Sequence, residues 1–177
     1  MSITTKNGDT GKTGLMFSKH ARKDDPRICA GGEVDELNAA IGLVKPHLSD
    51  GLIFQQLDII QKSLIKLMGE IATKPEDMKQ YEQSSFDKLT SSNVKQIEEW
   101  IKKIESQGIS FKDWAIPGKT ISSANLDFAR TVCRRAERSI VALTDQTISE
   151  TSQPIIYLNR LSDLLWLMAR SVEQSQN

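Results

Sequence analysis

Apolar residues recur at spacings of three and four from about residue 32 to the end of the chain. This period is typical of helices that bury one stripe of side chains. The clearest example is the segment 53–71, whose stripe alternates between the two spacings and consists of Ile53, Leu57, Ile60, Leu64, Leu67 and Ile71. Such a seam predicts a helix of about five turns that packs against another helix.

Four further segments carry the same period, and the helices predicted from them cover about residues 32–47, 91–104, 122–143 and 154–172. Local signals mark several of their ends, because Pro46 favours a stop and Pro154 suits a first turn. Cap candidates are the run Ser91, Ser92 and Asn93 for the third helix and Ser122 or Ser123 for the fourth. The pattern therefore predicts an all-α fold, a five-helix bundle.

The other segments predict little regular structure. Residues 74–90 are polar and aperiodic, which indicates a mobile connection, and only residues 2–5 and 114–116 could be extended. The first 31 residues then form an extended N-terminal arm that precedes the bundle. A chain of 177 residues with 38% apolar content suits a single domain, 1–177, around one core.

Composition narrows the class of partner. Lysine plus arginine equal aspartate plus glutamate at 23 each, so no overall field attracts nucleic acid or an anionic membrane. No stretch has the length of a membrane span or the pattern of a signal peptide, which predicts a cytoplasmic protein. Cys29 and Cys133 are far apart and have no metal-ligand spacing, which argues against a zinc site and a disulfide framework.

The fourth predicted helix carries a concentrated cationic surface. Arg130, Arg134, Glu137 and Arg138 follow one another at i, i+4, i+7 and i+8 and so share one face. One interpretation is a solvated face whose arginines are neutralised by Glu137. The other is a phosphate site, because guanidinium groups near the boundary of a core are well suited to phosphate oxygens.

Two other helices place polar residues among apolar ones. Asn159, Asp163 and Arg170 form a polar stripe on the fifth helix, either a wet face or a buried set whose Asn159 amide could bind adenine or ribose. Three acids open the first predicted helix, Glu33, Asp35 and Glu36. The helix dipole alone favours acids there, and the alternative is that Asp35 pairs with an arginine of the fourth helix.

The N-terminal loop 5–14 combines glycines, hydroxyls and lysines, a mixture that can wrap phosphate with backbone N–H groups. Gly11-Lys12-Thr13 resembles the end of a P-loop. However, that motif needs glycine where Lys6 stands, and no apolar strand precedes the loop, so a P-loop is excluded. A flexible tail remains the alternative to a nucleotide loop.

Five motifs occur in one order along nearly the whole chain: Thr5-Lys6-Asn7-Gly8-Asp9, Lys23-Asp24-Asp25-Pro26-Arg27, Glu33-Val34-Asp35-Glu36-Leu37-Asn38, the run from Ala129 to Arg138, and Asn159-Arg160-Leu161-Ser162-Asp163. Together they resemble the PduO-type ATP:cob(I)alamin adenosyltransferases. The resemblance implies a helical-bundle transferase that moves the 5′-deoxyadenosyl group of ATP to cob(I)alamin or a related corrinoid. The implied products are adenosylcobalamin and triphosphate.

The resemblance also implies the site residues. ATP would be bound by Thr5, Lys6, Asn7, Gly8, Thr13, Gly14, Lys23, Arg134, Arg135, Ala136, Glu137, Arg138 and Asn159. Asp35, Arg130 and Arg134 would support catalysis, with Arg130 paired to Asp35. Mg²⁺ would be bound mainly by the ATP phosphates, with Glu137 as its protein contact. Trp114 would contact the corrinoid.

By the same resemblance, the protein would be a homotrimer that binds ATP between neighbouring subunits. A reductase and an adenosylcobalamin-dependent enzyme would be its further partners. The chain departs from the family pattern at four positions around the corrinoid side, namely Gly31, Trp114, Lys119 and Asp127. A carrier that binds without turnover and a purely structural bundle are the alternative functions.

Overall fold

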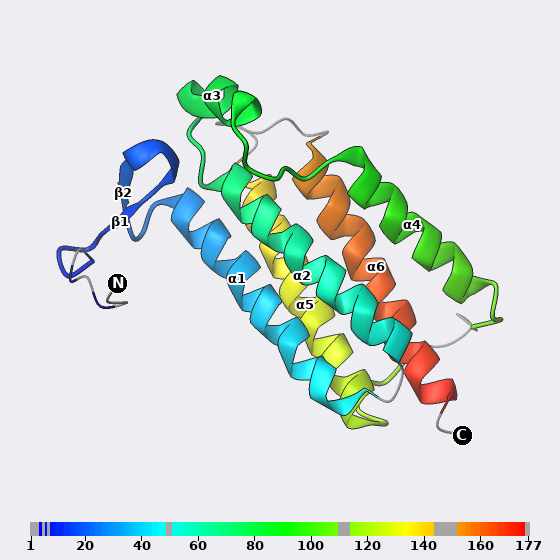
Figure 1. Ribbon diagram of the computed structural model, residues 1–177. Coiled ribbons are helices and arrows are strands. Elements are labelled where there is room, and N and C mark those ends of the chain that lie inside the picture. The colour runs from blue at the N-terminus through cyan, green and yellow to red at the C-terminus, as the bar shows by residue number, and fades with distance from the viewer. Residues whose placement is uncertain are drawn as a thin grey trace.

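The computed structural model describes residues 4, 6, 8–48, 51–109, 114–143 and 152–175. Five long helices lie side by side, and the N-terminal arm projects from one end of them (Figure 1). The five are α1 (Pro26–Val44), α2 (Gly51–Ile71), α4 (Ser91–Glu105), α5 (Ile121–Val141) and α6 (Gln153–Gln174). The predicted all-α, five-helix bundle is confirmed.

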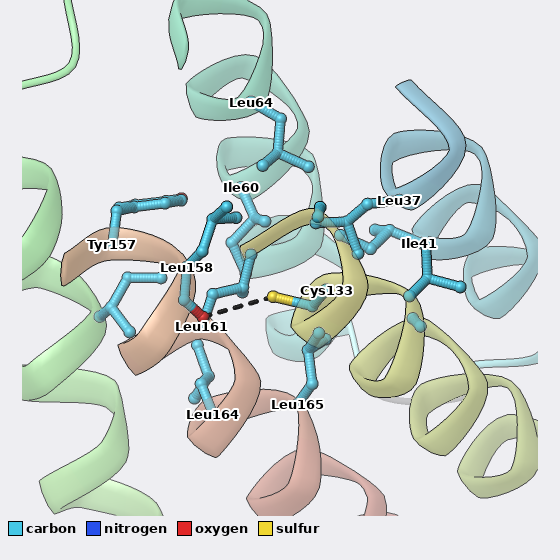
Figure 2. Packing of buried hydrophobic residues seen from close by; sticks show 14 of the residues in the cluster. Leu37, Ile41, Ile60, Leu64, Cys133, Tyr157, Leu158, Leu161, Leu164 and Leu165 are labelled. Carbon is cyan, nitrogen blue, oxygen red and sulfur yellow. Dashed lines mark hydrogen bonds between the residues drawn. The ribbon is translucent and has the colours of Figure 1, made fainter. Parts of the chain in front are cut away.

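The core lies where α5 packs against both α1 and α6, with α2 against α1 and α4 against α6. Leucine and isoleucine side chains from these helices meet there, as Figure 2 shows. Leu64, Leu161 and Leu165 are fully buried, and each such side chain contributes roughly 1.5–3 kcal/mol to the hydrophobic effect. The apolar stripe predicted from the spacing in α2 is thus the side of α2 that faces this core.

Helix α1 begins six residues earlier than the predicted start at residue 32. Asp25 caps it, because the Asp25 carboxylate accepts a hydrogen bond of 2.9 Å from the Arg27 backbone N–H, and Pro26 occupies the first turn. The adjacent glycines Gly31 and Gly32 interrupt the apolar period and conceal this first part of the helix. The acids from Glu33 onward therefore lie well inside the helix, so the dipole explanation for them is wrong.

The helices α4 and α5 begin where the sequence predicted, but a threonine caps each of them. Thr120 and Ser123 form a reciprocal pair at α5: the Ser123 N–H donates to Thr120 Oγ1 at 3.0 Å, and the Thr120 N–H donates to Ser123 Oγ at 3.2 Å. Thr90 precedes α4 in the same way, and its N–H donates to Asn93 Oδ1 at 3.0 Å. These capping boxes satisfy backbone N–H groups that the first helical turn leaves free.

Residues 74–90 are not a plain connection, contrary to the sequence prediction. They contain a 3₁₀ turn at Pro75–Asp77 and the short helix α3 (Met78–Gln83). Tyr81 is 2% exposed, and a Cβ added at Gly69 of α2 would lie 3.2 Å from the Tyr81 hydroxyl oxygen. A single aromatic that packs against a glycine gives no periodic signal, which is why the pattern did not reveal this helix.

The arm contains a two-stranded antiparallel ribbon, β1 (Lys12–Gly14) and β2 (His20–Arg22), with Thr13 opposite Ala21. Extended structure was predicted instead at residues 2–5 and 114–116. The latter segment forms no strand, and residues 2, 3 and 5 lie outside the described part of the chain. Strands of three residues are too short to show an alternating pattern. The ribbon contacts the bundle through the Met16 N–H, which donates to the Ala72 carbonyl at 3.0 Å.

No helix among the described residues has the length and apolar character needed to cross a membrane.

Candidate functional site

Several contacts fix the antiparallel register of α5 against α1 and the turn that follows α1. Ser139 Oγ donates to Glu33 Oε2 at 2.7 Å, Arg135 forms an ion pair with Glu36, and Ser122 Oγ donates to the His47 carbonyl at 2.5 Å. The C-terminal half of α5 therefore lies beside the first half of α1, at the end of the bundle that carries the arm (Figure 1). The acid–arginine pairing expected between these helices exists, but it joins Glu36 to Arg135.

Arg134 and Arg138 are the exposed arginines of this part of α5. Neither forms an ion pair with any residue that the structure describes, and Arg138 Nη1 donates to the Arg134 carbonyl at 3.0 Å. Other arginines of the described chain have carboxylate partners: Arg22, Arg130, Arg135, Arg160 and Arg170. Arg134 and Arg138 thus present unneutralised guanidinium groups, which are suited to a phosphate chain.

Asn159 of α6 adjoins this cationic face. Its Nδ2 donates to Glu137 Oε1 at 3.1 Å, and its Oδ1 accepts from Arg160 Nη1 at 2.7 Å. Arg160 is in turn bound by Glu98 of α4, with 3.3 Å between Nε and Oε1. The sequence offered no reason to assign a role to Arg160, although it lies next to Asn159. The reason is its contact with Glu98, and only the fold brings Glu98 close to it.

The arm contributes Lys23, which is exposed and forms no ion pair with a described residue. A Cβ at Gly8 would lie 3.0 Å from Lys23 Nζ, and the Lys23 N–H donates to the Gly11 carbonyl at 2.9 Å. Gly8 therefore leaves room for the ammonium group beside the loop. Lys6, Thr13 and Gly14 belong to the same arm, whereas the predicted Thr5 and Asn7 lie outside the described residues.

Ala136 and Cys133 face away from the arginine surface, into the core, and both are fully buried. The Cys133 thiol donates to the Leu158 carbonyl at 3.3 Å (Figure 2). Burial raises the pKa of this thiol, so it stays neutral and unreactive. Ala136 was predicted to bind ATP. Its side chain lies behind the cationic face, in the core, and therefore cannot reach a ligand on that face.

Within one chain, Arg130 pairs with Asp127 and no ion pair joins it to Asp35: Arg130 Nε lies 3.2 Å from Asp127 Oδ1. The α1–α5 register explains this, because Asp35 lies level with about residue 136 of α5, roughly 9 Å along the axis from Arg130 at 1.5 Å per residue. Asp35 itself is exposed. The predicted Asp35–Arg130 pair is therefore not an intrachain contact.

Trp114 lies near the opposite end of the bundle from the arm. It is 98% exposed, Ile116 beside it is 81% exposed, and the helix that follows begins next to His47 at the end of α1. The 19 residues of α1 separate the two regions by about 28 Å. One chain therefore does not bring its own arm and its own Trp114 together.

A cavity of about 490 Å³ lies between the arm and α2, lined by Met16, Lys62, Ile65, Lys66, Gly69, Tyr81, Phe86 and Asp87. None of the residues predicted to bind ATP or the corrinoid lines it. The described residues also contain no group of three or more His, Cys, Asp or Glu side chains placed to hold a metal ion. The predicted site is thus an open cationic surface on a single chain.

Comparisons with known proteins identify the family of the chain. The family model described as cobalamin adenosyltransferase matches residues 3–172. A corrinoid adenosyltransferase of Citrobacter freundii is 34% identical over 97% of this chain and 94% of its own length. One from Bacillus subtilis is 37% identical over 97% of this chain and 86% of its own length.

Solved structures show the same likeness. A variant of the PduO-type ATP:corrinoid adenosyltransferase from Lactobacillus reuteri, complexed with cobalamin and ATP, superposes with a TM-score of 0.86 at 34% identity, covering 99% of this chain and 95% of that one. A second variant of that protein, complexed with ATP, gives 0.86 at 32% identity over 98% and 95%. The chain belongs to the cobalamin adenosyltransferase family.

Proposed function

We propose that this protein transfers the 5′-deoxyadenosyl group of ATP to cob(I)alamin or a related corrinoid and releases triphosphate. The observation that carries the proposal is the pair Arg134 and Arg138, whose exposed guanidinium groups lack carboxylate partners among the described residues. They lie within about two to three turns of the start of α1, where the arm leaves the bundle. A solvated structural face would pair these arginines with carboxylates, as the chain does for Arg22, Arg135 and Arg160.

The chemistry needs orientation and charge more than proton transfer. Cob(I)alamin is a strong nucleophile, so its cobalt attacks the ribose C5′ without a general base. The Co–C5′ bond forms while the C5′–O bond breaks, and the electron pair departs with the triphosphate. Arg134, Arg138 and Lys23 would place cations where this negative charge develops, which stabilises the transition state.

Asn159 and Glu137 would orient the nucleoside end. Arg160 donates a hydrogen bond to the side-chain oxygen of Asn159, and the side-chain nitrogen of Asn159 donates one to Glu137. Glu137 is therefore held by one carboxylate oxygen, and its Oε2 forms no hydrogen bond with another described residue. That single carboxylate fits Mg²⁺, which prefers one or two protein carboxylates together with substrate phosphates. When bound, Mg²⁺ would neutralise part of the triphosphate charge.

A site shared between subunits of a homotrimer accounts for the parts that one chain leaves separate. The arm and Trp114 lie about 28 Å apart along α1. Asp35 is exposed and forms no ion pair with a described residue, and among those residues Arg130 has a partner at its Nε alone. In a ring of copies, Asp35 of one subunit would meet the outward-facing nitrogens of Arg130 in the next, and ATP would lie at that interface.

Trp114 and Ile116 would supply the apolar contact for the corrinoid. Both side chains are exposed, so their apolar surface is available to a ligand. By resemblance to the family, the aromatic at this position would help displace the lower axial base of cob(II)alamin and so ease its reduction. A reductase would then supply the electron, and an adenosylcobalamin-dependent enzyme would receive the product.

The test is turnover with purified protein, ATP, Mg²⁺ and cob(I)alamin produced by a strong reductant. The corrinoid absorption spectrum and the phosphate products are followed together. The proposal requires adenosylcobalamin and triphosphate in equal amounts. Tight ATP binding without turnover would instead identify a nucleotide carrier, and no binding of either substrate would identify a structural bundle.

A further inference from the structure

A row of side chains with alternating charges runs through the α5–α6 interface. It does not include Arg134 or Arg138, the arginines proposed to bind phosphate. It begins at Arg130 and continues through Asp127, Arg170 and Glu173 to Lys119. Asp127, Arg170 and Glu173 are 3%, 7% and 7% exposed, so three of its five members are buried. The predicted polar stripe of α6 is thus divided, because Arg170 lies in this interface while Asp163 is exposed.

Asp127 is the central member. Its Oδ1 accepts from Arg130 Nε at 3.2 Å, and its Oδ2 accepts from Arg170 Nη2 at 2.5 Å. A buried carboxylate needs such partners, because an unpaired one would be strongly destabilising. Both of its oxygens are therefore committed, and the carboxylate cannot rotate without breaking a charge-assisted hydrogen bond.

Arg170 is itself held on several sides. Its Nη2 lies 3.2 Å from Glu173 Oε1, and its guanidinium carbon lies 5.6 Å from the ring centroid of Trp166. Glu173 is in turn 4.0 Å from Lys119, which belongs to the segment that carries Trp114. Asp127 is thus anchored from the α6 side, and that anchor extends toward the corrinoid segment.

Arg130 is the outer end of this row of charges, with a side chain that is 26% exposed. Only its Nε has a partner among the described residues, so both terminal nitrogens remain available. We propose that Asp127 is a positioning residue for Arg130: by binding Nε, it aims the terminal nitrogens out of the bundle toward the reaction site. This inference rests on the proposed function, in which the terminal nitrogens of Arg130 meet Asp35 of the next subunit at the interface that binds ATP.

A purely structural role for Asp127 predicts different behaviour. In that case Asp127 only neutralises the buried Arg170, and its loss would lower stability and activity regardless of what stands at position 130. A positioning role acts through Arg130, so the effect on turnover must disappear once the guanidinium is gone. A double-mutant cycle separates the two roles.

The experiment measures adenosyltransferase kinetics and thermal midpoints for wild type, Asp127→Asn, Arg130→Ala and the double variant. We expect Asp127→Asn to lower kcat about 10-fold with the KM for ATP changed less than about 2-fold, and to cause no further loss in the Arg130→Ala background. Glu173→Gln is the matched control, because it disturbs the same buried arginine without contacting Arg130. It should lower the thermal midpoint while kcat stays within about 2-fold of wild type.

If Asp127→Asn does not fold, Asp127→Glu takes its place in the cycle. It keeps the charge and displaces the carboxylate, so it should lower kcat by a smaller factor that again vanishes with Arg130→Ala. An unchanged kcat, or a loss that persists in the Arg130→Ala background, would overturn the inference. Absence of turnover in the wild type would instead refute the proposed function, so the two failures are distinct.

Discussion

Asn159 on α6 donates a 3.1 Å hydrogen bond to Glu137 on α5. Its orientation is set by Arg160, which donates to the other end of the same amide at 2.7 Å. Arg160→Ala should release the amide to rotate, which weakens nucleotide binding. We expect the KM for ATP to rise about 5-fold with a smaller change in kcat, measured by steady-state kinetics.

Glu98→Gln provides the comparison for Arg160→Ala. It removes only the charge of the Glu98 carboxylate, whose Oε1 accepts a hydrogen bond of 3.3 Å from Arg160 Nε. Its effect on the KM for ATP should be clearly smaller. Equal effects of the two variants would mean that α4 packing, and not amide orientation, controls nucleotide binding.

Arg134→Ala should severely impair the use of ATP. The side chain is exposed and has no carboxylate partner among the described residues, so its removal leaves no buried charge behind. We expect kcat/KM for ATP to fall about 100-fold, the loss of a charge-assisted phosphate contact of about 2–3 kcal/mol, at unchanged thermal stability. Lys103→Ala, which removes an exposed cation of α4, should leave the kinetics unchanged. Wild-type kinetics for Arg134→Ala would return this face to the solvated interpretation.

Mixing two impaired chains tests whether the Asp35–Arg130 pair forms between subunits. Asp35→Ala and Arg130→Ala should each have strongly reduced but still measurable activity alone. In mixed trimers, roughly a quarter of the interfaces would combine an intact Asp35 with an intact Arg130, so activity should rise well above that of either variant. Each variant mixed with itself is the control. If co-expression restores nothing, the pair does not form across an interface.

Trp114→Ala should affect corrinoid use without affecting the fold of the chain. At 98% exposure the indole buries almost nothing within its own chain. We expect the KM for cob(I)alamin to rise about 10-fold while the KM for ATP stays within about 2-fold. A variant with normal corrinoid kinetics would show that the corrinoid binds elsewhere.

Glu70 on α2 makes stability depend on pH. Burial raises its pKa above the ordinary value, so folding favours the protonated form. The stabilisation that this preference gives is fully present below the ordinary pKa and is lost as pH rises through the raised one. Glu70→Gln should therefore melt at a higher temperature than wild type at pH 7, and the difference should disappear near pH 4. Thermal melts recorded across this range provide the measurement, and a lower midpoint at pH 7 would contradict it.

Periodicity predicted the parts of the fold that are determined by burial along a single helix. The α2 stripe from Ile53 to Ile71 is one buried face because each member falls on the same side of the helix. The start of α1 escaped prediction because its cap lies before a pair of glycines. Helix α3 escaped because its one buried contact, Tyr81 against Gly69, is a tertiary fit with no repeat in sequence.

The candidate site was predictable in its residue types but not in its pairings. Spacing placed the arginines on one face of α5, whereas the partner of each arginine depends on the register with α1 and α6. That register pairs Arg135 with Glu36, the neighbour of the expected Asp35. It also keeps Asp35 away from Arg130, which pairs with Asp127 of its own helix instead. Such choices depend on the relative axial positions of packed helices, which the sequence of each helix does not contain.

Arg27 fastens the first turn of α1 to the last turn of α2, since its Nη1 donates to the carbonyls of Ile71 at 2.6 Å and Thr73 at 2.8 Å. The root of the arm is therefore a fixed anchor point. Lys23 stands only two residues before the Asp25 cap, so this anchor keeps it on a short tether at its own end of the bundle and gives it a high local concentration there. Loosening the anchor with Arg27→Gln would enlarge the volume that Lys23 explores and so lower its local concentration beside Arg134 and Arg138.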